Sequence, residues 1–86
     1  MIKTVTTESG YTVSVDEEKL DDMRFVDALA ELQDNGLALP RVMDMVFTEE
    51  DKQRLYDHVR TDDGRVPIEK TTSELCEVLR ALEKNS

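Results

Sequence analysis

The sequence predicts an α+β fold, in which an N-terminal β-hairpin packs on a small bundle of about four helices. Two β-branched segments near the N-terminus flank a short turn, and four later segments carry apolar residues at helical spacing. The chain has 86 residues, which is the length of one domain, so residues 1–86 are expected to fold as a single unit.

The hairpin is expected over residues 2–15. Its first half is rich in β-branched side chains, and in its second half Tyr11, Val13 and Val15 alternate with polar residues. Gly10, in the turn, can adopt a positive φ. Because an isolated hairpin is only marginally stable in water, the apolar face must pack on the helices or on another subunit. The open edge of the hairpin could add strands between subunits and so build a homo-oligomer.

The first helix is expected over about residues 21–35. Phe25, Leu29 and Leu32 recur at helical spacing, which places them on one face. Acidic residues before this face suit the positive end of the helix dipole. The Asn35-Gly36 pair is expected to end the helix as a C-cap.

The second helix is expected over residues 40–47, with Pro40 in the first turn, where a missing N–H costs nothing. Only Arg41 and Asp44 are polar in this segment, so the helix is apolar on almost every side. A helix of this kind lies either in the core or at an interface.

The third helix is expected over residues 49–60, with Thr48 as its N-cap, and the fourth over residues 67–84, beginning at Pro67. Between them, Asp62-Asp63-Gly64 predicts a turn. The apolar stripe of the last helix consists of Ile68, Leu75, Leu79 and Leu82.

The net charge of −9 is concentrated in the middle of the chain. Residues 16–34 hold eight acidic and two basic residues, and residues 35–51 hold four acidic and one basic residue. Direct binding to nucleic acid is not expected, because phosphates are bound by Lys and Arg. A strongly negative surface could instead imitate a nucleic-acid backbone, so an acidic decoy that inhibits a nucleic-acid-binding protein is the alternative function. A solubilising acidic face explains the same charges.

The chain is expected not to be an enzyme and to need no metal or other cofactor. His58, the one histidine, has no neighbour at helical spacing that would complete a catalytic dyad, and it is expected at the surface. Cys76 lies within the apolar stripe of the last helix and is expected to be a small buried side chain rather than a nucleophile. The acidic run 16–22 lacks the glycine and the ligand spacing of an EF-hand loop.

The chain is expected in a reducing cytoplasm. A single cysteine cannot form an internal disulfide, which is typical of a reducing compartment. Polar residues follow Met1-Ile2-Lys3, where a secretion signal would be apolar. No segment approaches the roughly 20 apolar residues that span a bilayer, so no membrane partner is expected.

The second helix is the best candidate for binding a protein client, because methionine side chains adapt to varied partners. One arrangement places Val42 and Val46 in the core and turns Met43 and Phe47 outward. In the other arrangement the whole helix belongs to the core, since a chain of this size needs its apolar residues. The candidate contacts are Leu39, Met43, Met45 and Phe47.

Three short segments carry a pattern shared with a known family. Leu20-Asp21-Asp22-Met23 leads into the first helix, and Leu39-Pro40-Arg41-Val42 begins the second. The third segment runs from Leu55 through His58-Val59-Arg60 to Gly64-Arg65-Val66. With these segments the chain resembles the small tail assembly chaperones of long-tailed bacteriophages and prophages of Gram-positive bacteria. The resemblance covers most of the chain.

The resemblance implies a protein that is made just before the tape measure protein of the phage tail. Members of the family coat that long helical protein, recruit tail tube subunits to it and are absent from the finished virion. Many have a longer form made by a ribosomal frameshift, and this chain would correspond to the short form. The resemblance implies no catalytic residues and transfers no partner-binding residue. The partners it implies are a tape measure protein and tail tube subunits.

Overall fold

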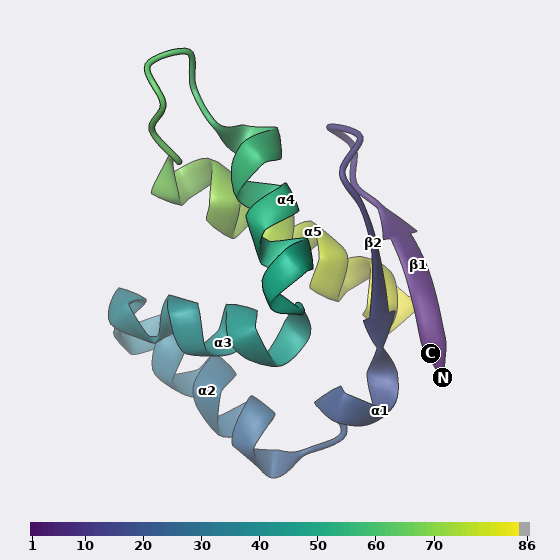
Figure 1. The fold of residues 1–86 in the computed structure, drawn as a ribbon. Helices are drawn as coiled ribbons and strands as arrows, with labels where there is room; N and C mark the ends of the chain where they lie inside the picture. The colour runs from purple at the N-terminus through teal and green to yellow at the C-terminus, as the bar shows by residue number, and fades with distance from the viewer. Residues whose placement is uncertain (85–86) are drawn as a thin grey trace.

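The computed structural model describes the backbone of residues 1–84 and the side chains of residues 1–83. It contains one antiparallel hairpin, four helices of eight or more residues and two shorter helical turns, which confirms the predicted α+β fold. Figure 1 shows the hairpin beside α4 and α5, with α2 and α3 at the other end of the molecule.

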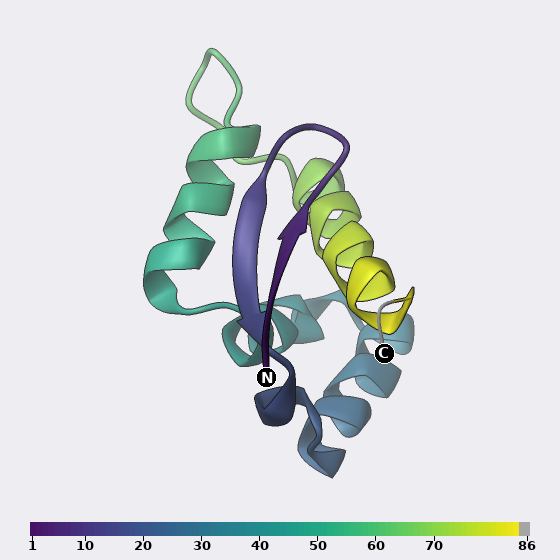
Figure 2. The same cartoon turned by 90° about the vertical axis from the view of Figure 1, so that its right-hand side faces the viewer.

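The hairpin joins β1 (Ile2–Thr6) to β2 (Thr12–Asp16), with Val5 opposite Val13. Gly10 has a φ of +99°, as the turn requires. The apolar face is buried in the core, which confirms that it packs on helices, whereas the other face carries paired Thr and Ser hydroxyls. The hairpin lies between α4 and α5 in Figure 2.

The two edges of the hairpin differ. The Thr7 N–H donates to the Tyr11 carbonyl at 2.8 Å, so by the alternation of an antiparallel ladder the backbone groups of Thr4 face away from β2. No described residue forms a hydrogen bond with these outward groups. At the other edge, the Arg54 guanidinium donates two hydrogen bonds of 3.1 Å to the outward carbonyl of Thr12. The β2 edge is therefore partly covered by Arg54, and just past β1 the outward Glu8 N–H donates to Glu77 of α5 at 3.2 Å.

The predicted first helix is α2 (Met23–Asp34), and a separate short helix that was not predicted, α1 (Glu17–Leu20), precedes it. Asp16 and Asp22 each accept a hydrogen bond from the backbone N–H two residues later, at 3.1 and 2.8 Å. Each aspartate therefore starts a helix of its own, because an aspartate side chain caps backbone N–H groups. Most of the acidic run therefore lies in a short helical turn.

A 3-10 turn, η1 (Gly36–Ala38), connects α2 to α3 (Leu39–Val46). The predicted end of α2 at Asn35 is right, but Gly36 does not have the positive φ of a glycine C-cap. The Asn35 side chain instead accepts from the Leu37 N–H at 3.1 Å and so begins η1. The second helix starts one residue earlier than predicted and has Pro40 in its first turn.

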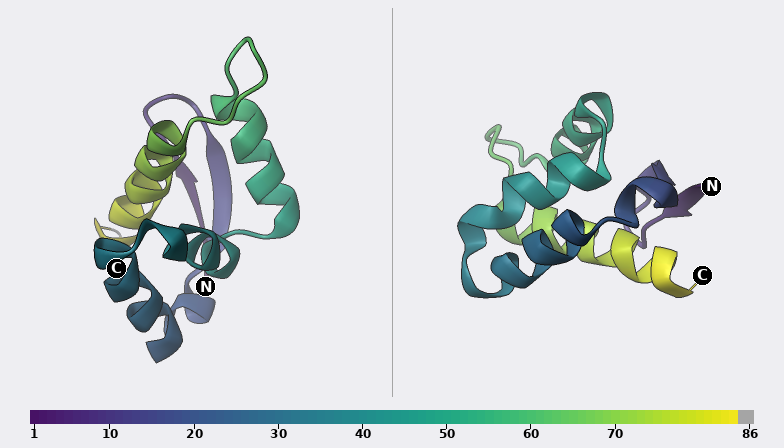
Figure 3. Two further views of the ribbon diagram at one scale, coloured as in Figure 1. Left: turned by 90° about the vertical axis from the view of Figure 1, so that its left-hand side faces the viewer. Right: turned by 90° about the horizontal axis from the view of Figure 1, so that it is seen from below.

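The last two helices are α4 (Glu49–Val59) and α5 (Ile68–Lys84). Thr48 caps α4 as predicted, since its hydroxyl accepts from the Asp51 N–H at 3.1 Å. Gly64 has a φ of +88° in the predicted turn between the helices. Ile68 is exposed, so its predicted place in the buried stripe of α5 is wrong. In Figure 3, α5 extends across the molecule and ends beside the hairpin, where it contacts β1.

One apolar core joins the hairpin to α2, α3, α4 and α5. Its most deeply buried large side chains are Val13, Val15, Val42, Met43, Leu55, Leu75 and Val78. None of the helices in the described part of the chain combines the length and the apolar character needed to cross a membrane.

Candidate protein-binding surfaces

The four candidate contacts of the second helix do not form one surface. Met43 and Phe47 are only 1% and 5% exposed, so their predicted outward orientation is wrong. The reason is that α1, α2 and α4 all contact α3, so that most of its apolar surface is covered. Leu39 and Met45 are half-buried, and Val46 lies in the core as predicted.

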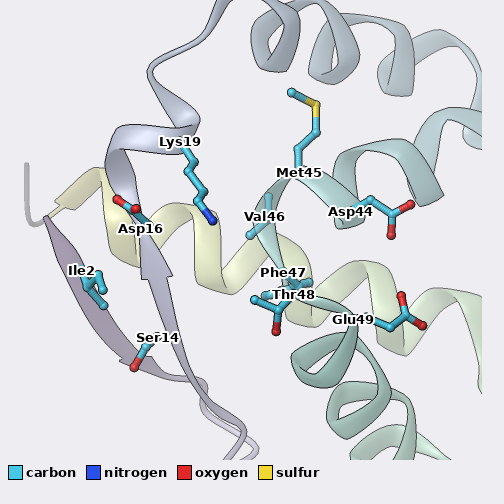
Figure 4. Close-up of a pocket in the computed structure, with 10 residues that line it drawn as sticks. All are labelled: Ile2, Ser14, Asp16, Lys19, Asp44, Met45, Val46, Phe47, Thr48 and Glu49. Atoms are coloured by element: carbon cyan, nitrogen blue, oxygen red, sulfur yellow. The ribbon is translucent and has the colours of Figure 1, made fainter.

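Met45 and Phe47 line a hollow between the hairpin and the junction of α3 and α4, called here the corner hollow. Its volume is about 500 Å³. Figure 4 shows Ile2 and Ser14 on the hairpin side, and Met45 at the end of α3. Charged side chains from α1, α3 and α4 also line this hollow, so an entering group would meet both apolar and charged atoms.

Lys52 stabilises the corner at which α3 gives way to α4. Its ammonium lies 2.8 Å from a carboxylate oxygen of Asp44 and 3.1 Å from one of Glu49. Hydrogen bonds to Asp44 and then to Glu49 raise the pKa of Lys52 above its ordinary value. Two of the three acidic residues that line the corner hollow, Asp44 and Glu49, are therefore held in place by one cation.

Leu39 and Met43 line a second, smaller hollow of about 220 Å³ on a different side of α3. Tyr56 from α4 and Val66 and Ile68 from the following segment complete it. This helix hollow is mostly apolar, and the exposed Ile68 side chain lies at its border. The candidate contacts thus divide between two hollows that share α3 as a wall.

The structure brings together three polar residues that sequence reasoning did not connect. Ser9 in the hairpin turn lies with its hydroxyl 3.0 Å from Nε2 of His58 and donates a hydrogen bond to Oε1 of Glu74. Glu74 is buried in α5, and its Oε2 has no hydrogen-bond partner among the described residues. His58 lies at the surface as predicted, with its side chain 31% exposed. No helical spacing connects these residues, because they come from three separate elements.

The Ser9–His58–Glu74 group differs from a catalytic relay. In a Ser-His-acid relay the hydroxyl meets one imidazole nitrogen and the carboxylate orients the other. Here Oε1 of Glu74 lies 3.7 Å from Nε2 of His58, which is the same nitrogen that faces Ser9. The group connects the hairpin turn to α4 and α5, and its carboxylate does not orient the imidazole through the second nitrogen as in that relay.

Tyr11 packs beside this group and fixes the hairpin on α4. Its ring meets Phe47 edge-on at a centroid distance of 6.3 Å, and it lies 5.8 Å from the His58 ring. The hydroxyl donates to the Asp51 carbonyl at 2.8 Å. Burial raises the pKa of Tyr11 to about 12, and the nearby positive charge of Arg54 only partly opposes this shift.

Cys76 is exposed, so the prediction of a small buried side chain is wrong. On α5, Leu75 and Val78 face the core, and Cys76 lies about 100° around the helix from Leu75. Among the described residues, no three His, Cys, Asp or Glu side chains lie together in a way that could hold a metal ion.

Comparison of the chain with models of protein families, with curated proteins and with solved structures found no match.

Proposed function

We propose that the chain is a non-enzymatic phage tail assembly chaperone, which acts in the host cytoplasm, binds the tape measure protein and recruits tail tube subunits to it. The observation that carries the proposal is the pair of hollows on α3, which offer leucine and methionine side chains to a client. Methionine and aliphatic walls suit a client with varied apolar side chains. The resemblance in three sequence segments supplies the identity of the client.

The resembling segments lie at structural junctions. Asp22 begins α2, Pro40 lies in the first turn of α3, and Gly64 forms the turn after α4. Leu55, in the third segment, is fully buried. Residues at such positions determine the fold, so their similarity to the family supports a similar fold more directly than a similar contact with a client. The binding residues have to be found on the surface of this chain.

The geometry around His58 supports the non-enzymatic part of the proposal. Ser9 and Glu74 meet the same imidazole nitrogen, and no carboxylate of the described residues orients the other nitrogen. If His58→Gln and Cys76→Ser together leave client binding and tail assembly intact, the role is one of binding. A loss of function with the client still bound would instead indicate chemistry at one of these two side chains.

A direct binding experiment tests the client. The purified chain is mixed with the tape measure protein from the same genome, and affinity is measured by calorimetry. Met45→Asp in the corner hollow and Leu39→Asp in the helix hollow should each weaken binding by about tenfold, because a carboxylate would be desolvated in the contact. Leu37→Asp, at an exposed leucine outside both hollows, is the matched control. No binding by the unmodified chain would refute the proposal.

The acidic decoy is the second candidate, and the observation that favours it is the exposed acidic surface of α1 and α2. The two functions differ in their response to salt. Affinity of a decoy for a basic target should fall steeply as salt rises, since the contacts are between exposed charges. Binding through the apolar hollows should persist. A tape measure complex that dissociates completely at about 0.5 M salt would favour the decoy.

A further inference from the structure

A groove separate from both hollows lies between α1, α2 and the second half of α5, and is called here the α2–α5 groove. Its volume is about 470 Å³. Leu20, Leu29 and Leu79 are half-buried in its walls, and Phe25 and Leu82 reach it from the core. The walls are therefore aliphatic and aromatic side chains that the fold leaves partly uncovered.

The apolar surface continues out of the groove along α2. Leu29, Val26 and Met23 are spaced three residues apart, so their side chains form one ridge on the helix. Val26 is 49% exposed and Met23 is 69% exposed. Continuity with the groove distinguishes these two side chains from scattered surface apolar residues, which need no explanation.

Carboxylates border the groove. Glu17, Asp21 and Glu83 line it, and Glu17 also forms an ion pair of 3.1 Å with Lys3. Across residues 17–34, which form the α1–α2 wall, there are seven acidic and two basic residues. One of those bases, Arg24, is held by Asp22 at 2.7 Å. An occupant of the groove would therefore lie in a strongly negative field.

We propose that the α2–α5 groove binds one amphipathic helix of a partner protein, with apolar side chains in the groove and Lys or Arg residues along its border. Helix-in-groove recognition uses an apolar stripe at helical spacing, which matches the ridge and walls described above. The acidic border selects a basic helix over an acidic one. A second copy of this chain does not fit, because its own net charge is −9.

This inference rests on the proposed function, in which the client is a helical tape measure protein. It assigns the main contact with that client to α2 rather than to α3. Basic residues beside the apolar stripe would steer the client to the acidic face before the apolar contact forms. The corner hollow and the helix hollow would then contact other parts of the client or the tail tube subunits.

Fluorescence anisotropy with a synthetic helix tests the groove without the natural client. The probe is a labelled peptide of about 18 residues, or about 27 Å as a helix, with Leu at helical spacing and Lys elsewhere. Its partner probe has Glu in place of every Lys. The Lys peptide should bind the full chain, and the Glu peptide should bind at least about tenfold more weakly.

Matched variants locate the binding site of the Lys peptide. Val26→Arg places a cation and extra bulk on the ridge and should weaken binding by about tenfold or more, whereas Leu37→Arg should change it by less than about twofold. Leu37 is 87% exposed and lies outside the groove, so both variants add the same charge at exposed apolar positions. Circular dichroism and urea unfolding confirm that both variants fold.

Three results would overturn the groove proposal: equal binding of the two peptides, equal effects of Val26→Arg and Leu37→Arg, or binding that salt abolishes and Val26→Arg leaves unchanged. The same variants separate this inference from the proposed function. If a tape measure protein binds the unmodified chain and the Val26→Arg variant equally well, the groove proposal is wrong and the proposed function is retained. If the Lys peptide binds in the groove but no tape measure protein binds the chain, the proposed function is wrong and the groove proposal is retained.

Discussion

The helices α2 and α3 both carry many apolar residues, yet they expose them very differently. In α3, Val42, Met43 and Val46 are all buried, because other elements contact that helix on more than one side. In α2 only Phe25 and Ala28 are buried, and the apolar surface continues outward onto the ridge. The apolar content of a helix in a small domain therefore does not identify a binding surface, since the number of neighbouring elements decides what remains exposed.

The largest expected effect is on the free energy of unfolding when a buried residue of α3 is truncated. Met43→Ala should lower the free energy of unfolding by about 2–5 kcal/mol, because it leaves a cavity in a fully packed core. Met43→Leu, which conserves volume, should cost less than about 1.5 kcal/mol. Urea unfolding measures both. If Met43→Ala costs no more than a substitution on the ridge of α2, the contrast between a buried α3 and an open α2 is wrong.

Tyr11 gives a pH-dependent test of the buried side of the molecule. Because its pKa rises from 10.0 in the unfolded chain to about 12 in the folded one, the folded state holds the phenolic proton more tightly. The resulting stability, on the order of 2 kcal/mol, is complete below pH 10 and is lost as the pH rises from 10 through 12.

Two variants isolate this effect from other groups that titrate at high pH. In Tyr56→Phe, Tyr11 is the only tyrosine, and its absorbance at alkaline pH should change with a midpoint near 12. In Tyr11→Phe, the loss of stability between pH 10 and 12 should be smaller than in the unmodified chain. A midpoint near 10 would mean that the hairpin does not bury Tyr11 against α4 in solution.

A smaller effect is expected at the corner between α3 and α4, where the buried helix ends. Thr48→Ala removes the side-chain acceptor for the Asp51 N–H and should cost about 1 kcal/mol of unfolding free energy. Thr48→Ser keeps the acceptor and should cost only a few tenths of a kcal/mol. A similar loss in both variants would show that the methyl group of Thr48, rather than its hydroxyl, stabilises the corner.

The smallest expected effect on stability is on α2. Val26→Ala should change the unfolding free energy by no more than about 0.5 kcal/mol, because the side chain is half exposed. It should nevertheless weaken binding of the Lys peptide measurably, since the ridge loses two methyl groups. A large loss of stability would place Val26 in the core in solution and would remove the ridge as a free surface.

The sequence was sufficient to predict the hairpin, its buried face and the approximate positions of the long helices. The alternation of Tyr11, Val13 and Val15 and the turn at Gly10 are local signals, and the structure confirms them. The exposure of Cys76 could also have been predicted, because one residue of an α-helix turns the side chain about 100° away from the buried Leu75. The prediction assigned Cys76 to the apolar stripe of the last helix without applying this rotation.

Other features depend on how distant elements meet, so local patterns could not predict them. The burial of Met43 and Phe47 follows from the packing of several elements around α3. The Ser9–His58–Glu74 group joins residues that are 49 and 65 positions apart from Ser9. The split between α1 and α2 reflects a competition between two aspartate caps and one continuous helix, and that competition is decided by only a few kcal/mol at most.

The bond from Arg54 to Thr12 limits how the two-stranded sheet can grow. A strand added at β2 would have to displace the guanidinium from the outward Thr12 carbonyl. A strand added at β1 would approach α5, which contacts β1 and whose Glu77 accepts a hydrogen bond from the Glu8 N–H just past that strand. Strand pairing between copies would therefore compete with contacts of the fold at both edges, and we expect copies of this protein to associate through their helices instead.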